Sequence, residues 1–354
     1  METDFLIIGQ GLAGSLLAWA LIQRGCKVVV VDTGKENASL VAVGIINPIT
    51  GMRFAKTADV ETLLPTAQNY YNQLSAYFGQ QFYFDKPMLR IFRDQTELAH
   101  CKKRQHQADY APYLGKLYTL DQSMTGFSTP FGFIEQRQTG NLLTVPLLTH
   151  MKQFFIERHS YRQDVVDYKA IQLGSIVHWQ DITAKQVVFC EGYQASQNPW
   201  FSWLPFQPAK GEILTLEHQV ELPDMILNYG NWLLPFESGK VRIGATFDRE
   251  NINTQVSEQG KQTLLKTLKS YSPGMAQSRI VDHQAGIRPC TPDRLPFMGK
   301  HPRINQIAIF NGFGAKGSLQ IPWYAQRFAD YLLNHNPLPP SCDIQRFQTT
   351  HFTG

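Results

Sequence analysis

Three glycines and an aspartate near the N-terminus have the residue types and the spacing that bind a dinucleotide. Gly9, Gly11 and Gly14 follow a short apolar run. The first permits a tight turn, the second lets the backbone approach a pyrophosphate, and the third lets a following helix pack closely. Asp32 ends the next apolar run, where its carboxylate can accept both hydroxyls of an adenosine ribose. These residues predict a site for the ADP part of FAD or NAD.

Two arginines and a tyrosine are candidates for binding a substrate. The planar guanidinium of Arg288 can hold a carboxylate through two hydrogen bonds, and the adjacent Pro289 stiffens its backbone. A surface ion pair is the alternative role for this arginine. Arg53 lies in a glycine loop, where an arginine is more often solvated, and Tyr229 either caps the substrate pocket or packs in a core. Arg288 is therefore the first candidate for orienting an anionic substrate.

The elements that must position the glycine motif follow from the pattern of apolar residues. Residues 4–8 predict a buried parallel strand, residues 15–24 a helix that ends at Gly25, and residues 27–31 a second strand. A helix that begins at the glycine turn directs its free backbone amides at the phosphates. Because strand, turn, helix, strand and acid occur in this order, the segment predicts a βαβ dinucleotide-binding unit.

The rest of the chain predicts an α/β protein with two kinds of sheet. Residues 1–78, 140–206 and 283–354 are expected to form a Rossmann-like FAD/NAD(P)-binding domain. Residues 79–139 and 207–282 alternate in the way of antiparallel strands, and they include a helical segment over 255–271. We expect them to form a discontinuous β-rich, α+β substrate domain, with the reaction at the junction of the two domains.

Composition excludes several other classes of protein. The net charge of +4 over 354 residues is spread along the chain, so a nucleic-acid partner is not expected. The five cysteines lie far apart and form no metal-ligand pattern, which favours reduced thiols and a cytoplasmic location, and no metal site is predicted. The sequence has no unbroken apolar stretch of the length of a membrane span, about 18 residues. The oligomeric state is not indicated.

Several segments, in order, resemble the D-amino acid oxidase superfamily of flavoproteins, and within it glycine oxidase, sarcosine oxidase and the FAD domain of a bifunctional tRNA-wobble-uridine modifying enzyme. The segments are residues 9–14, 38–48, 187–192, 208–214, 243–246, 284–299 and 306–317. The resemblance runs from the first strand to the last helix. It implies that the dinucleotide is FAD.

The resemblance also implies which residues contact FAD. They include a helix N-terminus after the last glycine loop, which would favour negative charge on the flavin pyrimidine. Glu191 departs from the Ala-Thr-Gly pattern that is usual before Gly192, and its role is open. The implied contacts are Gly9, Gly11, Leu12, Ala13, Gly14, Asp32, Thr33, Ser39, Gly44, Ile45, Asn47, Val166, Gly192, Arg288, Gly312, Phe313, Gly314, Ala315, Lys316 and Gly317.

The activity that the resemblance implies is the oxidation of a small amine or amino acid. A hydride would pass from the C–H bond next to nitrogen to flavin N5, the imine would be hydrolysed, and oxygen or another acceptor would reoxidise the flavin. Arg288 aligns with the carboxylate-binding arginine of glycine oxidase, and Lys316 with a lysine of sarcosine oxidase near the substrate carboxylate. Arg53 and Tyr229 complete the candidate set.

Alternative functions stay open at this point. A 2-hydroxy acid dehydrogenase, or an enzyme that oxidises a carboxymethylamine group on a tRNA base, would keep the enzyme class and change the substrate. A non-catalytic FAD-binding subunit of a larger dehydrogenase would keep the nucleotide fold and lack turnover.

The attachment of FAD can be predicted from the same alignment. Sarcosine oxidase links its flavin through a cysteine, which aligns with Gly286 and not with Cys290. A displacement of four residues along a strand is about 13 Å, too far for the same bond. We therefore expect noncovalent FAD, with Cys290 as a packing residue.

Overall fold

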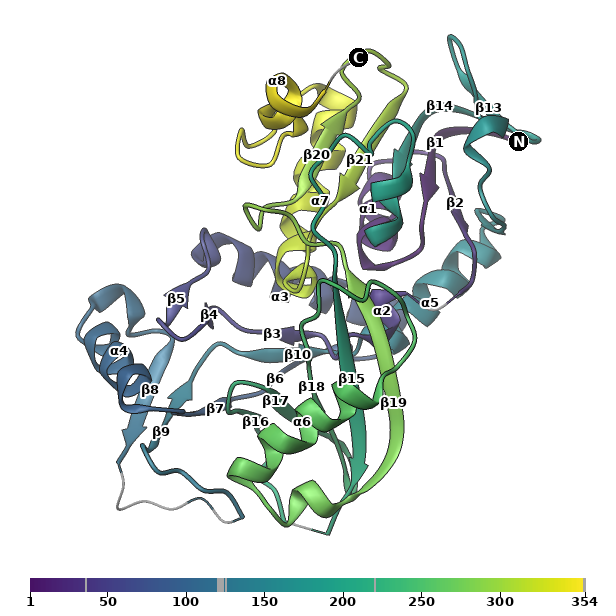
Figure 1. Ribbon diagram of the computed structural model, residues 1–354. Helices are drawn as coiled ribbons and strands as arrows, with labels where there is room; N and C mark the ends of the chain where they lie inside the picture. The colour runs from purple at the N-terminus through teal and green to yellow at the C-terminus, as the bar shows by residue number, and fades with distance from the viewer. Residues whose placement is uncertain (36, 120–123, 125, 220, 353–354) are drawn as a thin grey trace.

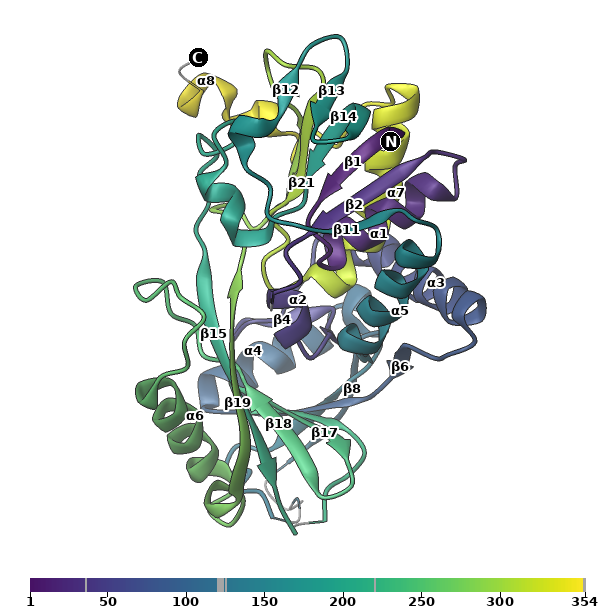
Figure 2. The same ribbon diagram turned by 90° about the vertical axis from the view of Figure 1, so that its right-hand side faces the viewer.

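The computed structural model describes residues 1–35, 37–119, 124, 126–219 and 221–352 and contains two large sheets (Figures 1 and 2). The first has the order β11-β2-β1-β14-β13-β12, and β21, which also pairs with β20, pairs with β14 on the same edge as β13 but further along the strand. Its central strands β11, β2, β1, β14 and β21 are parallel. The strands are β1 (Glu2–Ile8), β2 (Val28–Asp32), β11 (Tyr161–Gln163), β12 (Gln172–Leu173), β13 (Val177–Trp179), β14 (Ile182–Phe189), β20 (Phe297–Lys300) and β21 (Ile307–Asn311).

Alternate side chains of β1 and β2 enter two different cores, one on each face of this sheet. Phe5 and Ile7 pack with α1 (Leu12–Ile22), α3 (Val60–Phe78), α5 (Thr144–Glu157) and α7 (Gly317–Asn334). Leu6 and Ile8 pack with residues of the 168–206 region on the other face. Successive strand residues point to opposite faces, so burial on both sides explains why these runs are continuously apolar. The predicted βαβ unit is present.

The second sheet has the order β19-β15-β18-β17-β16-β7-β9-β8, and its pairs are antiparallel except for β7 with β16. In Figure 2, α6 (Glu258–Tyr271) lies beside β15 and β19, and Leu264 and Leu268 of this helix share a core with the sheet. The strands are β7 (Met88–Ile91), β8 (Leu114–Tyr118), β9 (Phe133–Gln136), β15 (Ala209–Glu217), β16 (Ile226–Asn228), β17 (Trp232–Glu237), β18 (Lys240–Gly244) and β19 (Arg279–Arg288).

Short elements join the two sheets. The helix α2 (Ala38–Val41) packs on β19, where a Cβ at Gly286 would lie 3.3 Å from the Ala38 Cα. The remaining elements are β3 (Ile45–Ile46), β4 (Ile49–Thr50), β5 (Ala55–Lys56), β6 (Tyr83–Asp85), β10 (Gly140–Leu142), α4 (Gln95–Gln105), α8 (Gln348–His351), and the 3₁₀ turns η1 (Ala108–Tyr110), η2 (Tyr168–Ala170), η3 (Gly192–Gln197), η4 (Met275–Gln277) and η5 (Ile344–Phe347).

One implied FAD contact, Val166, lies in the loop that follows the end of β11 at Gln163. One sequence-based boundary differs from the structure. The expected domain boundary between residues 282 and 283 falls inside β19, which is paired with β15 along its length. The extent of β19 depends on its pairing with β15, a strand about 70 residues earlier in the chain. The local periodicity of the sequence contains no information about such a pairing. The five-part division of domains stays a prediction.

Within the described residues, no helix combines the length and the apolar character that a membrane crossing requires. The same residues bring together no group of three histidine, cysteine or acidic side chains that could hold a metal ion.

A buried ion network fastens α4 to the second sheet. Glu97, which is 1% exposed, accepts hydrogen bonds from Arg90 and from the Nε atom of Arg93, the latter at 3.0 Å. Arg90 also donates to the Gly51 carbonyl oxygen. Buried charges are tolerated only when they are paired, so Glu97 neutralises an arginine that is itself almost fully buried.

We predict that Glu97→Ala destabilises the protein strongly, because it leaves the buried Arg90 guanidinium without a counter-charge. The expected loss is about 3–5 kcal/mol in the free energy of unfolding, measured by urea denaturation. Glu237→Ala is the control, since Glu237 is exposed and pairs with Lys240 at the surface. It should change the unfolding midpoint little. Similar losses in both variants would contradict the assignment.

Candidate cofactor and substrate site

One cavity of about 860 Å³ runs along the place where the two sheets meet. It is lined by the glycine turn after β1, the end of β2, the turn after β14, α2, and the loop before α7. The second sheet contributes Gly211, Ile213, Trp232 and the last residues of β19. The volume is within the usual range for ligand and cofactor sites, about 300–1,000 Å³. Both sheets therefore contribute to a single site.

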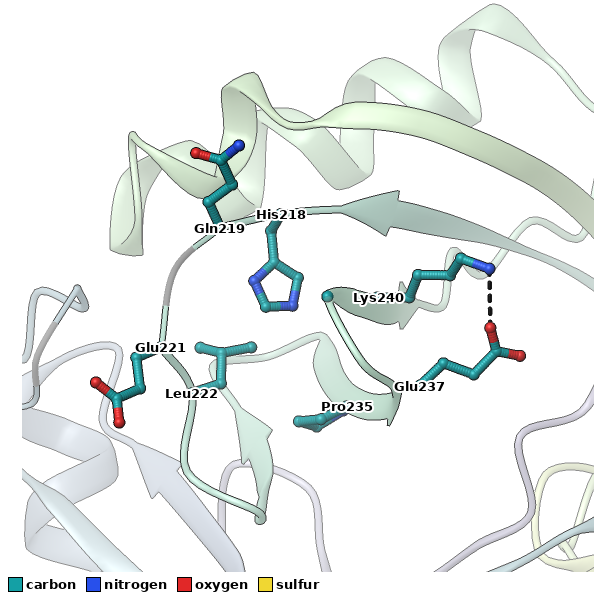
Figure 3. Close-up of a pocket in the computed structure, with 8 residues that line it drawn as sticks. His218, Gln219, Glu221, Leu222, Pro235, Glu237 and Lys240 are labelled. Atoms are coloured by element: carbon teal, nitrogen blue, oxygen red, sulfur yellow. Dashed lines mark hydrogen bonds and ion pairs between the residues drawn. The ribbon is translucent and has the colours of Figure 1, made fainter.

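A smaller hollow of about 320 Å³ lies at the other end of β15 (Figure 3). It contains the surface pair of Lys240 and Glu237, whose Nζ and Oε2 atoms are 2.8 Å apart. Its described walls bring no group of catalytic side chains together, and we assign it no function. The residues that line it are His218, Gln219, Glu221, Leu222, Pro235, Glu237, Gly239 and Lys240.

The glycine turn after β1 has the shape of a phosphate cradle. Gly9 has a φ of +105°, and a Cβ at Gly14 would lie 1.9 Å from the Gly9 carbonyl oxygen, so neither position accepts a side chain. Gly11 caps α1 and has no side chain of its own, and the Leu12 amide of the first turn donates to the Ser39 hydroxyl at 3.0 Å. Gly11, Leu12 and Ala13 line the cavity, and a helix N-terminus of this kind binds anions.

Asp32 lies at the end of β2 and lines the same cavity. Its Oδ2 atom accepts from the Gln10 amide and its Oδ1 atom accepts from the Gly34 amide, each at 2.7 Å. Each carboxylate oxygen has a second lone pair, so the two backbone bonds fix the group and leave acceptors for ribose hydroxyls.

The loop before α7 forms the other end of the site. Gly312 and Gly314 have positive φ angles, and α7 begins after Lys316 without a side-chain cap. Most of the residues that sequence reasoning assigned to FAD line the cavity: Gly9, Gly11, Leu12, Ala13, Asp32, Thr33, Ser39, Gly44, Ile45, Val166, Gly192, Arg288, Phe313, Gly314, Ala315 and Gly317. Gly14, Asn47, Gly312 and Lys316 shape the surrounding turns and are not part of this lining.

Arg288 is the last residue of β19 and faces the cavity from the second sheet. Its Nη1 atom donates to the carbonyl oxygens of Thr246 at 3.2 Å and Lys210 at 3.4 Å. A Cβ at Gly211 would lie 2.1 Å from Nη2, so the guanidinium occupies the space that this glycine leaves. Burial lowers the pKa of Arg288, and no acidic side chain of the described residues forms an ion pair with it.

The other three candidate substrate residues do not line the cavity. The Lys316 ammonium donates to the Thr57 hydroxyl at 3.0 Å, and burial, together with Arg294, lowers the pKa of this lysine. Arg53 is exposed. Tyr229 is completely buried in the core of the second sheet beside Tyr271, with ring centroids 5.2 Å apart. Of the two roles that the sequence left open for Tyr229, the structure favours packing in a core, because the β-rich sheet encloses its ring.

Sequence reasoning missed Trp232 and the neighbours of Glu191. Trp232 lines the cavity, and its ring lies over Gly244, where a Cβ would be 2.6 Å from the ring. Tyr168 and Asn198 contact the Glu191 side chain. The sequence showed that Glu191 departs from the usual Ala-Thr-Gly pattern. Its hydrogen-bond donors Tyr168 and Asn198 lie 23 and 7 residues away and belong to no recognisable motif, so the sequence did not identify them.

A Rossmann-like sheet with a glycine turn shaped as a phosphate cradle, an acid at the end of β2 and a cavity shared with a β-rich sheet is the arrangement of a dinucleotide-dependent oxidoreductase. The sequence profile of the family described as FAD dependent oxidoreductase (DAO) matches residues 4–331. The chain belongs to this family, and its dinucleotide is FAD.

Three similar proteins illustrate the relationship. The glycine oxidase of Pseudomonas aeruginosa is 22% identical over 359 residues, which cover 96% of this chain and 97% of that protein. A tRNA 5-methylaminomethyl-2-thiouridine biosynthesis bifunctional protein of Legionella pneumophila is 25% identical over 316 residues, 85% of this chain and 46% of that protein. The crystal structure of glycine oxidase from Bacillus cereus has a TM-score of 0.81 at 21% identity and covers 95% of this chain and 96% of that one. The expected superfamily and fold class are confirmed.

The residues present fit FAD. The cradle would hold the pyrophosphate and Asp32 the ribose, and the loop before α7 lines the same cavity as the second sheet. Cys290 is half-buried, and its Sγ atom would lie 3.6 Å from a Cβ at Gly314. Burial raises the pKa of its thiol, which disfavours the nucleophilic thiolate.

We predict that Asp32→Ala weakens FAD binding and leaves the fold largely intact. Charge-assisted hydrogen bonds contribute roughly 1.5–3 kcal/mol, so the Kd should rise about ten- to a hundredfold. Fluorescence titration of the flavin-free chain with FAD measures it. Asp330→Ala, which removes a carboxylate that pairs with Arg24, is the control and should keep the parental Kd. Unchanged affinity in Asp32→Ala would place the ribose elsewhere.

We also predict that FAD is bound noncovalently. Acid precipitation should release all of the yellow colour into the supernatant, and Cys290→Ser should keep its flavin. A yellow pellet from the parent protein that becomes colourless in Cys290→Ser would show that this sulfur is bonded to the ring.

Proposed function

We propose that this protein oxidises a small amine or amino acid whose carboxylate is held by Arg288. The observation that carries the proposal is a half-buried guanidinium that faces the FAD cavity and has no acidic partner among the described residues. A cation that is partly removed from water and has no counter-charge is costly, and a carboxylate ligand would neutralise it. The names of the full-length relatives, glycine oxidases, support the same class of substrate.

The chain itself would orient the substrate. The carbonyl oxygens of Lys210 and Thr246 hold one edge of the Arg288 guanidinium, so its plane is fixed before a ligand arrives. A fixed planar fork reduces the freedom that a carboxylate loses on binding. Bound FAD would supply the hydride acceptor for the carbon next to the amine nitrogen.

The walls near Arg288 are apolar. Ile213, Trp232 and Ala245 line this part of the cavity. An apolar wall disfavours a charged ammonium, so it would favour the neutral amine, whose lone pair assists removal of the hydride. It would also keep water from the reacting carbon. The role of the protein is then orientation and exclusion of water, which requires no catalytic triad or metal.

Lys316 would support the site by fixing the position of the loop before α7. Its bond to Thr57 holds the loop before α7 against the 55–60 segment, and a substrate carboxylate would reach Arg288 first. The loop is one of the walls of the FAD cavity, so Lys316 would act on the site through the position of that loop.

Anaerobic reduction of the flavin tests the proposed reaction. Glycine, N-methylglycine, proline, D-amino acids and 2-hydroxy acids are mixed separately with the purified yellow protein without oxygen. Bleaching by an amine with a carboxylate supports the proposal. Bleaching by hydroxy acids alone would change the substrate class, and no bleaching by a broader panel would indicate a binding-only subunit.

We predict that Arg288→Lys raises the Kd of a small monocarboxylate inhibitor strongly, because it keeps the charge and loses the planar fork. The expected increase is about ten- to a hundredfold, from the roughly 1.5–3 kcal/mol of a charge-assisted bond. Perturbation of the flavin absorption spectrum reports the binding. Arg303→Lys is the matched control at an exposed arginine outside the cavity lining. If Arg288→Lys bound the inhibitor as the parent does, Arg288 would have a structural role only.

A further inference from the structure

Glu191 is an acid that lines the FAD cavity at the phosphate cradle. It follows Cys190 at the end of β14 and precedes Gly192. A Cβ at Gly9 would lie 3.4 Å from the Glu191 amide nitrogen, so the two turns are in contact. The backbone of Glu191 therefore lies beside the turn that would receive the pyrophosphate, and its carboxyl group is held by Tyr168 and Asn198. Neither ribose binding nor amine oxidation gives this carboxyl group a role.

The contacts of Glu191 come from neutral groups. The Tyr168 hydroxyl donates to its Oε1 atom and the Asn198 amide donates to its Oε2 atom, both at 2.8 Å. No lysine or arginine of the described residues forms an ion pair with it. Two hydrogen bonds to neutral donors offset burial only in part, and burial raises the pKa of Glu191 to about 7.

The other ionisable groups around this carboxyl would add no positive charge. The Cys190 thiol is kept neutral by burial, which raises its pKa, and the hydroxyl of Tyr168 has a raised pKa for the same reason. Two acidic residues, Asp32 and Asp164, also line the cavity, and the nearby turn η3 contributes the phenol of Tyr193 to the lining. The cations of the lining, Lys35 and Arg288, make no ion pair with Glu191.

FAD brings two negative phosphate groups to this cradle. A like charge near a carboxyl group favours its protonated form, so bound FAD would raise the pKa of Glu191 further. We propose that Glu191 is protonated when FAD is bound, so that binding of the cofactor takes up a proton. This inference concerns retention of the cofactor and does not depend on which substrate is oxidised.

The sign of the pH dependence follows from the two states. Below about pH 7, Glu191 keeps its proton with and without FAD, and the Kd does not depend on this group. At higher pH the free protein loses the proton and must regain it on binding. The Kd for FAD should then rise by up to about tenfold per pH unit, until the pH passes the pKa in the complex.

Calorimetry of FAD binding to the flavin-free, full-length chain measures the proton directly. Titrations at pH 6 and pH 8, each in two buffers with different ionisation enthalpies, give the number of protons taken up. For a free-protein pKa near 7, we expect about 0.1 proton at pH 6 and about 0.9 at pH 8. Glu191→Gln keeps the size of the side chain and cannot titrate, so it should bind FAD with no uptake from this group at pH 8.

Asp164→Asn is the matched control. Asp164 lines the same cavity, and the hydrogen bond from Gln180 lowers its pKa, so it is ionised across this pH range. Its replacement removes a negative charge and should leave the proton uptake of the parent in place.

Tyr168→Phe gives a second test if Glu191→Gln does not fold. It removes a donor that lowers the pKa of Glu191, so the pH at which uptake reaches half a proton should move upward. Equal uptake at pH 8 in the parent and Glu191→Gln, or no upward movement in Tyr168→Phe, would overturn the proposal. Because the readout is a proton count, such a result would leave the proposed amine oxidation untouched.

Discussion

The close approach of three backbone segments at the phosphate cradle is the constraint on which the rest of the structure depends. A Cβ at Gly9 would lie 2.5 Å from the Cys190 carbonyl oxygen, and one at Gly14 would lie 1.9 Å from the Gly9 carbonyl oxygen. Without these glycines, α1 could not begin so close to β1, and the turn after β14 would move away. The exposed helix N-terminus and the cavity wall both require this packing.

The second sheet adds to the cavity a charge that no acidic side chain of the described residues neutralises. Arg90 is buried and pairs with Glu97, whereas Arg288 is half-buried and is held by two carbonyl oxygens, with the Phe247 ring 5.8 Å away. The first arrangement fastens the fold. The second leaves a cation whose counter-charge would come from a ligand, as the proposed function requires.

Two acids of the cavity show how surroundings set the role of one functional group. Asp32 receives two backbone amides and is held for hydrogen bonding to a ribose. Glu191 receives two neutral side-chain donors beside the phosphate cradle, and burial raises its pKa. The same carboxyl group is therefore suited to accept hydroxyl donors at one position and to carry a proton at the other.

The sequence by itself determined the elements that depend on neighbours in the chain. The glycine spacing, the apolar runs of β1 and β2, and the position of Asp32 were sufficient to predict the βαβ unit and its ligand class, because these interactions are local. Most of the FAD contacts that the resemblance to known flavoproteins implied also line the cavity.

Only the tertiary structure decided where the remaining candidates lie. It buries Tyr229 in a core, directs Lys316 to Thr57 and exposes Arg53. It gives Arg288 two carbonyl oxygens and, among the described residues, no acidic partner. It also brings Tyr168 and Asn198 to Glu191. These contacts join segments that are far apart in the chain, and the pairing of β15 with β19 and of β1 with β14 sets them. Residue type and spacing carry no record of such pairings, so the chemistry of these side chains could be assigned only after the sheets were assembled.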